Sequence, residues 1–190
     1  MRRGLLGGTF DPPHLAHLIA GEAAYRALAL DEVTFIPAGA PWQKADREVS
    51  DAEDRWEMAR RAVAGVEYFR ADDREVRRDG WSYTIDTIAE FAQDEIVLIM
   101  GADAAAGLPA WHRAEEVMTR ASVAVMPRPG VDRGTVEATG ASVHWLDVVP
   151  LAVSGTLLRA RCRAGLSIRF YVPEPVHRYV IDRGLYGHQA

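Results

Sequence analysis

Two histidines near the N-terminus carry the most distinctive chemistry in this sequence. His14 and His17 are three residues apart, so on a helix they share one face and can act on one ligand. They follow two adjacent glycines, Gly7 and Gly8, whose missing Cβ atoms let a bulky ligand approach the backbone. A helix that begins beside this turn points N–H groups and a partial positive charge at an anion. The stretch 7–17 therefore predicts a nucleotide phosphate site with two imidazoles placed for chemistry.

Other kinds of site fit this stretch less well. A zinc site needs a third ligand, and the remaining histidines form no second pair: His112, His144, His177 and His188. The G-x-G-x-x-G spacing of a dinucleotide-binding turn is absent, and the run 33–36 leads into Pro37 rather than into an acidic ribose ligand. No glycine is followed by the Lys-Ser or Lys-Thr pair of a P-loop. A turn that serves only packing stays open as an alternative.

The composition limits the class of protein. The 190 residues, 26% charged and 48% hydrophobic, predict a single soluble domain over residues 1–190. The net charge of -5 argues against general nucleic-acid binding, and no apolar run reaches membrane-spanning length. The N-terminus lacks the apolar core of a signal peptide, and the single cysteine, Cys162, suits a reducing cytosol. We therefore expect a cytoplasmic protein that binds neither nucleic acid nor membrane.

Strand-like and helix-like segments alternate along the chain. A first short strand is expected at Leu5 and Leu6, and the other expected strands are 33–36, 66–69, 74–76, 96–100, 122–126 and 143–148, of which 66–69 and 74–76 have weaker support. A helix after the glycine turn should bury Leu15, Leu18, Ile19, Ala23, Ala27 and Leu30. Further helices are expected from a capping box at 50–53 and over 84–91. This alternation predicts an α/β fold: a Rossmann-like, doubly wound, mainly parallel sheet with helices on both faces.

Because ligands of such sheets bind beyond the carboxyl ends of the strands, the loops there hold further candidates. After the strand 96–100 come Gly101 and Asp103, whose carboxylate could cap the next helix or accept hydrogen bonds from ribose hydroxyls. Trp111 lies in a loop beside Pro109 and His112, so it either belongs to the core or stacks on a flat ring.

Two helix starts and one loop could hold anions. Thr84 begins an expected helix, where a Ser or Thr cap and a bound carboxylate are both compatible with the sequence. Ser154 and Thr156 begin another, and Arg159 lies three positions after Thr156 on the same face, so it can reach the same anion. An ordinary Ser-capped helix with surface arginines is the alternative. Lys44 lies in a Pro-rich loop, where it is either solvated or able to clamp a phosphate.

These segments resemble a known family. Gly8-Thr9-Phe10-Asp11-Pro12 with His14 and His17 resembles the H-x-G-H motif of nucleotidyltransferases, with Ala16 where that family usually has glycine. The later segments resemble, in the same order, bacterial nicotinate-nucleotide adenylyltransferases: 41–44, 80–87, 101–104, 108–112 and 154–156. In the last segment the family usually has Ser-Ser-Thr followed by isoleucine and arginine. Gly155 and Leu158 therefore depart from the pattern, while the hydroxyls and Arg159 are kept.

The resemblance implies a reaction in which ATP and nicotinate mononucleotide give nicotinate adenine dinucleotide and pyrophosphate. It implies direct in-line attack, with Mg²⁺ brought by ATP and no metal site on the protein. It assigns ATP binding to Gly8, Thr9, Phe10, His14, His17, Gly101, Asp103, Ser154, Thr156 and Arg159, with His14, His17 and Arg159 catalytic. It assigns nicotinate mononucleotide to Lys44, Thr84 and Trp111. The sequence shows no pair of nucleophile and base, which fits a reaction that depends on positioning and charge.

Two alternatives differ from this assignment. Phosphopantetheine adenylyltransferase shares the first motif and fold, but the segments around Thr84 and Trp111 argue against it. A nucleotide sensor without catalysis is the alternative from another class, and the retention of both histidines and Arg159 argues against it. The sequence leaves open the protonation of the histidines, the choice between nicotinate and nicotinamide mononucleotide, and whether the protein is a homo-oligomer.

Overall fold

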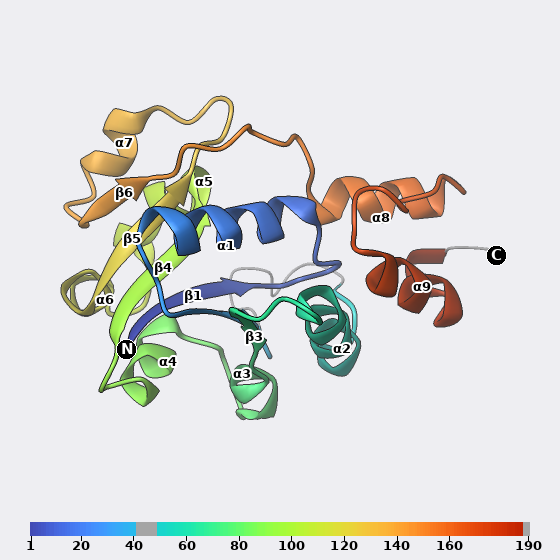
Figure 1. Ribbon diagram of the computed structural model, residues 1–190, viewed down its shortest axis with the longest axis horizontal. Coiled ribbons are helices and arrows are strands. Elements are labelled where there is room, and N and C mark those ends of the chain that lie inside the picture. The colour runs from blue at the N-terminus through green and yellow to red at the C-terminus, as the bar shows by residue number, and fades with distance from the viewer. Residues whose placement is uncertain (41–48, 188–190) are drawn as a thin grey trace.

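A computed structural model of the protein describes residues 1–40 and 49–187. At its centre lies a sheet to which these residues contribute six strands, in the order β3-β2-β1-β4-β5-β6 (Figure 1). The strands are β1 (Arg2–Gly8), β2 (Glu32–Pro37), β3 (Phe69–Ala71), β4 (Glu95–Gly101), β5 (Ala121–Met126) and β6 (Val143–Trp145). Every pair of neighbouring strands is parallel, and the order reverses between β1 and β4. The predicted Rossmann-like, doubly wound fold is therefore confirmed.

Helices cover both faces of the sheet. They are α1 (Leu15–Ala27), α2 (Ala52–Val63), α3 (Arg74–Arg77), α4 (Thr84–Glu90), α5 (Ala102–Ala106), α6 (Ala114–Arg120), α7 (Arg133–Glu137), α8 (Gly155–Arg163) and α9 (Glu174–Asp182), with 3-10 turns η2 (Leu108–Ala110) and η3 (Leu185–Gly187). Along β4 the side chains alternate: Val97 and Ile99 join a core cluster with α1 and α2, whereas Ile96 and Leu98 join one with α4, α5 and α6. None of the helices in the described part of the chain is long and apolar enough to cross a membrane.

Helix α1 approaches the sheet through small residues rather than through the predicted face. Its buried residues are Ala16, Ala20, Gly21 and Ala24. A Cβ on Gly21 would lie 3.1 Å from the Phe69 ring and 3.2 Å from the Phe35 ring, so the aromatic side chains of β2 and β3 leave space only for small ones. The helix ends before Leu30, and Ile19 is exposed. The predicted apolar face is therefore wrong at Ile19 and Ala27, which are exposed, whereas Leu18, Ala23 and Leu30 do pack in or against the core cluster.

The segment 66–76 also differs from the prediction. Strand β3 begins only at Phe69, because the Phe69 N–H donates to the Val66 carbonyl within a turn. The expected strand 74–76 is helix α3 instead. Its start is stabilised by the Asp72 carboxylate, which accepts the Arg74 N–H at 2.9 Å, a local bond that competes with strand pairing. Strand β6 is shorter than expected and ends at Trp145.

The expected side-chain caps of two helices are absent. Helix α2 begins at the predicted place, but its N-cap is Asp51 and no side chain caps it. The Ser50 N–H lies 3.4 Å from the Asp11 carboxylate instead. Helix α4 begins after Tyr83, again without a side-chain cap. Just before α4, the Ser82 hydroxyl likewise accepts the Gly39 N–H from another loop.

The C-terminal helices lie beyond the carboxyl end of β1, as Figure 1 shows. Leu158 and Cys162 of α8 and Val176 and Val180 of α9 form a third buried cluster, which Met58 of α2 joins. This cluster explains why Cys162 is buried. It also holds the start of α8 close to the glycine turn.

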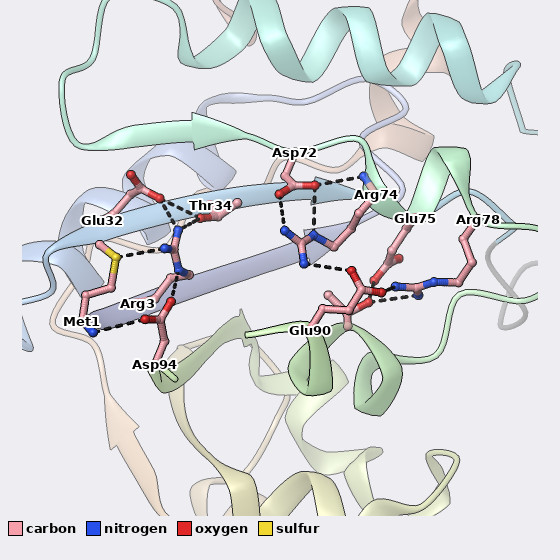
Figure 2. Close-up of polar contacts among 11 residues, drawn as sticks. Met1, Arg3, Glu32, Thr34, Asp72, Arg74, Glu75, Arg78, Glu90 and Asp94 are labelled. Atoms are coloured by element: carbon pink, nitrogen blue, oxygen red, sulfur yellow. Dashed lines mark hydrogen bonds and ion pairs between the residues drawn. The ribbon is translucent and has the colours of Figure 1, made fainter. Parts of the chain in front are cut away.

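Ion pairs connect neighbouring strands at the amino end of the sheet (Figure 2). The Arg3 guanidinium of β1 donates to Asp94 at 2.7 Å and to Thr34 at 3.1 Å, and it pairs with Glu32. These groups precede or begin β1, β2 and β4, so they lie at the end of the sheet opposite the glycine turn. They support the fold rather than the candidate site.

Candidate active site

A cavity of about 360 Å³ lies where the strand order reverses, between the ends of β1 and β4. Its volume is within the range of small-molecule sites, and its place is the one that this sheet topology favours. Six of the predicted residues line it: Gly8, Thr9, His17, Thr84, Asp103 and Trp111. The structure thus brings together residues from the first turn, the start of α4, α5 and the loop after η2.

The two glycines of the turn after β1, Gly7 and Gly8, have different neighbours. A Cβ on Gly7 would meet no atom within 4 Å, so this glycine borders open space in the cavity. A Cβ on Gly8 would lie 3.3 Å from the Phe10 ring of the same chain. Phe10 adopts a φ of 50°, in the left-handed region. Its side chain is 2% exposed and packs under the turn in the core, so it does not line the cavity. The requirement for glycine at position 8 therefore comes partly from packing.

The rings of His14 and His17 lie side by side, as their spacing predicted, and they stack with centroids 3.7 Å apart. The main-chain N–H of His14 donates to the ring atom Nδ1 of His17 at 3.1 Å. Because Nδ1 accepts this bond, a neutral His17 ring would carry its proton on Nε2. His14 is 3% exposed, and its burial, with a smaller contribution from Arg128, lowers its pKa to about 4. His14 is therefore neutral at pH 7 in this structure.

The start of α8 meets the first motif through Asp11. Ser154 is the N-cap and accepts the Leu157 N–H at 3.2 Å. Arg159 Nη1 donates to the Asp11 carbonyl at 2.7 Å, and Nη2 lies 3.5 Å from the Thr156 hydroxyl. The predicted shared face of Thr156 and Arg159 is therefore confirmed. Ser154, Thr156 and Arg159 do not line the cavity itself.

Gly101 and Asp103 begin α5. Gly101 is the N-cap, and Asp103 lies in the first turn without capping it, so the capping alternative was wrong. Arg128 Nε lies 3.7 Å from the Asp103 carboxylate, and the Arg128 charge reaches His14. Sequence reasoning missed Arg128, although it follows the strand 122–126 at the carboxyl edge of the sheet, where site residues were expected.

Thr84, at the start of α4, and Trp111, just after η2, also line the cavity. Trp111 packs partly against the core cluster as well, so the core alternative applies in part and stacking on a flat ring stays a prediction. Glu75 and Ser82 line the cavity too, and neither was predicted. Burial raises the pKa of Glu75, whose carboxylate accepts the Thr87 hydroxyl at 2.6 Å. Lys44 lies outside the described residues.

Metal ligands do not cluster in this part of the molecule. Among residues 1–40 and 49–187, no group of three or more His, Cys, Asp or Glu side chains is arranged to hold a metal ion. His17 lines the cavity beside the glycine turn, and Arg159 donates to the Asp11 carbonyl of the first motif; imidazole and guanidinium groups suit phosphate oxygens.

Residues 5–161 match the cytidylyltransferase-like family. The whole chain is 38% identical to a protein of Dehalococcoides mccartyi, of which it covers 98%, and which is described as a probable nicotinate-nucleotide adenylyltransferase. The chain belongs to the nicotinate-nucleotide adenylyltransferase family. A relative from Geobacillus kaustophilus with the same description is 39% identical, with 97% of this chain and 85% of that protein covered. The nicotinic acid mononucleotide adenylyltransferase of Plasmodium falciparum, solved in complex with NaAD, has the same fold at 14% identity, with a TM-score of 0.84 over 99% of this chain and 98% of that one.

The structure accounts for two of the three departures from the adenylyltransferase pattern, Ala16 and Gly155. Ala16 is 1% exposed within the core cluster under α1, so only a small side chain fits there. A Cβ on Gly155 would lie 2.7 Å from the Asp11 carbonyl oxygen. In this member of the family, glycine at position 155 allows α8 to approach the first motif closely.

Asp11 links the two ends of this adenylyltransferase chain, a role that its sequence did not reveal. Its side chain is buried, accepts the Tyr186 hydroxyl at 2.7 Å, and lies 3.6 Å from Arg159 Nη1. Burial and the Asp11 charge raise the pKa of Tyr186 strongly, so this hydroxyl stays a donor. The two residues are 175 positions apart, and no local pattern signals such a pair.

Proposed function

We propose that the chain transfers the adenylyl group of ATP to nicotinate mononucleotide, giving nicotinate adenine dinucleotide and pyrophosphate. The observation that carries this proposal is the composition of the cavity. Its lining includes Gly8, Thr9 and His17 of the first motif together with Thr84 and Trp111. A phosphate-binding turn and a flat aromatic side chain thus face one space, and the chain's membership of the family supplies the substrates.

The reaction we propose is a direct in-line displacement. An oxygen of the acceptor's 5′-phosphate forms a bond to the α-phosphorus of ATP while the bond from that phosphorus to the α,β-bridging oxygen breaks. The electron pair of the broken bond leaves with pyrophosphate, and no covalent enzyme intermediate forms. Such a transfer depends mainly on positioning and on stabilisation of charge.

We assign the triphosphate to the first and last motifs. His17, with its Nε2 proton, donates to a phosphate oxygen near the cavity wall. His14 stacks against it and fixes its orientation. Arg159, with the capped start of α8 at Ser154 and Thr156, holds the β- and γ-phosphates. We propose His17 and Arg159 as catalytic residues and His14, predicted as catalytic from the sequence, as the residue that positions His17, because it is 3% exposed and does not line the cavity.

The remaining predicted residues divide between the two nucleotides. Gly8, Thr9 and Phe10 form the turn against ATP, and Gly101 and Asp103 meet its ribose. Trp111 stacks on the pyridine ring, and the start of α4 at Thr84 holds the ring carboxylate through backbone N–H groups. Lys44 neutralises phosphate charge in this proposal, which rests on sequence alone.

Mg²⁺ accompanies ATP in this proposal. Mg²⁺ binds ATP through phosphate oxygens and keeps several of its waters, so it needs no dedicated protein cage. The ion supplies positive charge to the triphosphate when it is bound. We also propose that residues 1–190 act as a single domain in the cytoplasm.

The test is pyrophosphate release from ATP and Mg²⁺ with three separate acceptors: nicotinate mononucleotide, nicotinamide mononucleotide and phosphopantetheine. We expect a strong preference for the first. A preference for phosphopantetheine would overturn the substrate and the assignment of Thr84 and Trp111. Binding of ATP without turnover of any acceptor would favour a nucleotide sensor.

A further inference from the structure

Arg55 of α2 is a buried arginine whose bonds converge on the walls of the cavity. Its side chain is 2% exposed. Nε donates to the Ser50 carbonyl at 2.9 Å, Nη1 to the Thr9 carbonyl at 3.1 Å and also to the Ala38 carbonyl, and Nη2 to the Gly39 carbonyl at 2.8 Å. A single guanidinium thus contacts main-chain oxygens of three separate loop segments.

Two of these acceptors belong to residues that line the cavity. Thr9 follows β1 and Ala38 follows β2, and the same nitrogen, Nη1, bonds to both carbonyls. Arg55 therefore sets the distance between the glycine turn and the neighbouring loop. Arg55 itself does not line the cavity.

The contact at Gly39 extends this connection to the opposite wall. The Gly39 N–H donates to the Ser82 hydroxyl at 3.0 Å, and Ser82 lines the cavity beside Thr84. A Cβ on Gly39 would lie 2.0 Å from the Glu75 carbonyl oxygen, so this loop has no room to shift in that direction. A continuous set of contacts thus runs from Thr9 through Arg55 and Gly39 to Ser82.

The partners of Arg55 are unusual for a buried cation. A buried charge is costly unless it is paired or fully hydrogen-bonded. The hydrogen bonds of its guanidinium go to main-chain carbonyl oxygens, and the Asp11 and Asp51 carboxylates act on its charge without accepting one of these bonds. The planar fork of arginine can reach several carbonyls at fixed angles, whereas the single nitrogen of lysine cannot.

We propose that Arg55 is a positioning residue for adenylyl transfer: it holds the Thr9 turn and the loop at 38–39 in the arrangement that aligns the two phosphates. This inference rests on the proposed function. A displacement of about 1 Å in such a site costs about 10²-fold in rate. We therefore expect Arg55→Lys to lower kcat by about 10²-fold while the KM for ATP changes less than kcat.

The matched control is Arg3→Lys, because Arg3 is also a poorly exposed arginine with several partners but lies at the other end of the sheet (Figure 2). Both variants should lower Tm. The kinetic constants are measured well below the lower Tm, and only the Arg55 variant should lose kcat. If Arg55→Lys does not fold, Arg55→Gln, which is neutral and keeps one donor group, replaces it in the same comparison.

Amide hydrogen exchange separates this inference from the proposed function, because it needs no turnover. In Arg55→Lys, peptides covering 5–13 and 36–40 should exchange about tenfold faster, while the peptide covering 95–101 should not change; Arg3→Lys should leave the first two unchanged. If the wild-type enzyme transfers no adenylyl group, the proposed function fails, and exchange still decides whether Arg55 holds the turn. Equal kcat and equal exchange in the Arg55 and Arg3 variants would overturn the inference.

Discussion

The buried imidazole of His14 should make the free energy of unfolding depend on pH between about 4 and 6.5. Its pKa is about 4 in the folded protein and 6.5 when unperturbed, because burial disfavours the charged ring. In this range the unfolded chain binds more protons than the folded one. The stabilisation is therefore fully present above pH 6.5 and is lost as the pH falls towards 4.

The size of the effect follows from the shift in pKa. A difference of about 2.5 units, at about 1.4 kcal/mol per unit, corresponds to about 3.5 kcal/mol in total. About 2.5 kcal/mol of this should be lost between pH 7 and pH 4.5. That is a large part of the stability of an ordinary domain.

The assay is urea unfolding of the wild type and of His14→Asn at pH 7 and pH 4.5. Asparagine is a favoured N-cap residue that does not titrate, so it keeps the start of α1 while removing the proton site. Other groups, such as Glu57 with its pKa of about 2, titrate in both proteins and cancel in the comparison. The wild type should lose about 2.5 kcal/mol more than the variant. Equal losses in the two proteins would refute the assignment of a neutral, buried His14.

Three further substitutions test the site and its supports. His17→Ala should lower kcat by about 10²–10³-fold in steady-state assays if its Nε2 proton stabilises the transition state; near-normal turnover would remove it from the catalytic residues. Tyr186→Phe should lower the free energy of unfolding by about 1.5–3 kcal/mol in urea titrations, because the buried Asp11 carboxylate loses a donor, and an unchanged midpoint would contradict this. Gly39→Ala should destabilise by about 1–3 kcal/mol in the same assay, since its Cβ would meet the Glu75 carbonyl at 2.0 Å; wild-type stability would show that the loop can move.

The strands were the most predictable part of the fold. The runs at 33–36, 96–100 and 122–126 all lie within buried parallel strands, because such strands are covered on both faces and so read as continuous apolar sequence. The short strand β3 was misplaced, since local turns at Val66 and Asp72 compete with pairing there. Its pairing with β2 depends on residues far away in the chain.

Helix faces and caps were less predictable, because their neighbours come from elsewhere in the chain. The buried face of α1 depends on the aromatic rings of Phe35 and Phe69, which leave room only for Gly21 and alanines. Ser50 looked like part of a helix cap, yet its N–H points to Asp11. The loss of a side-chain N-cap costs about 1 kcal/mol, and tertiary contacts such as these can outweigh that cost.

The sequence by itself determined the class of fold, the paired histidines on one helix face and the capped start of α8, because each depends on neighbours within a few residues. Only the tertiary structure decided which residues share the cavity, that Gly155 must clear the Asp11 carbonyl, and that Arg55 joins the loops at Thr9 and Gly39. These contacts join segments that are distant in sequence, so they arise only when the sheet brings the carboxyl ends of its strands together. The chemistry of the motifs is local, but their alignment into one site is a property of the whole fold.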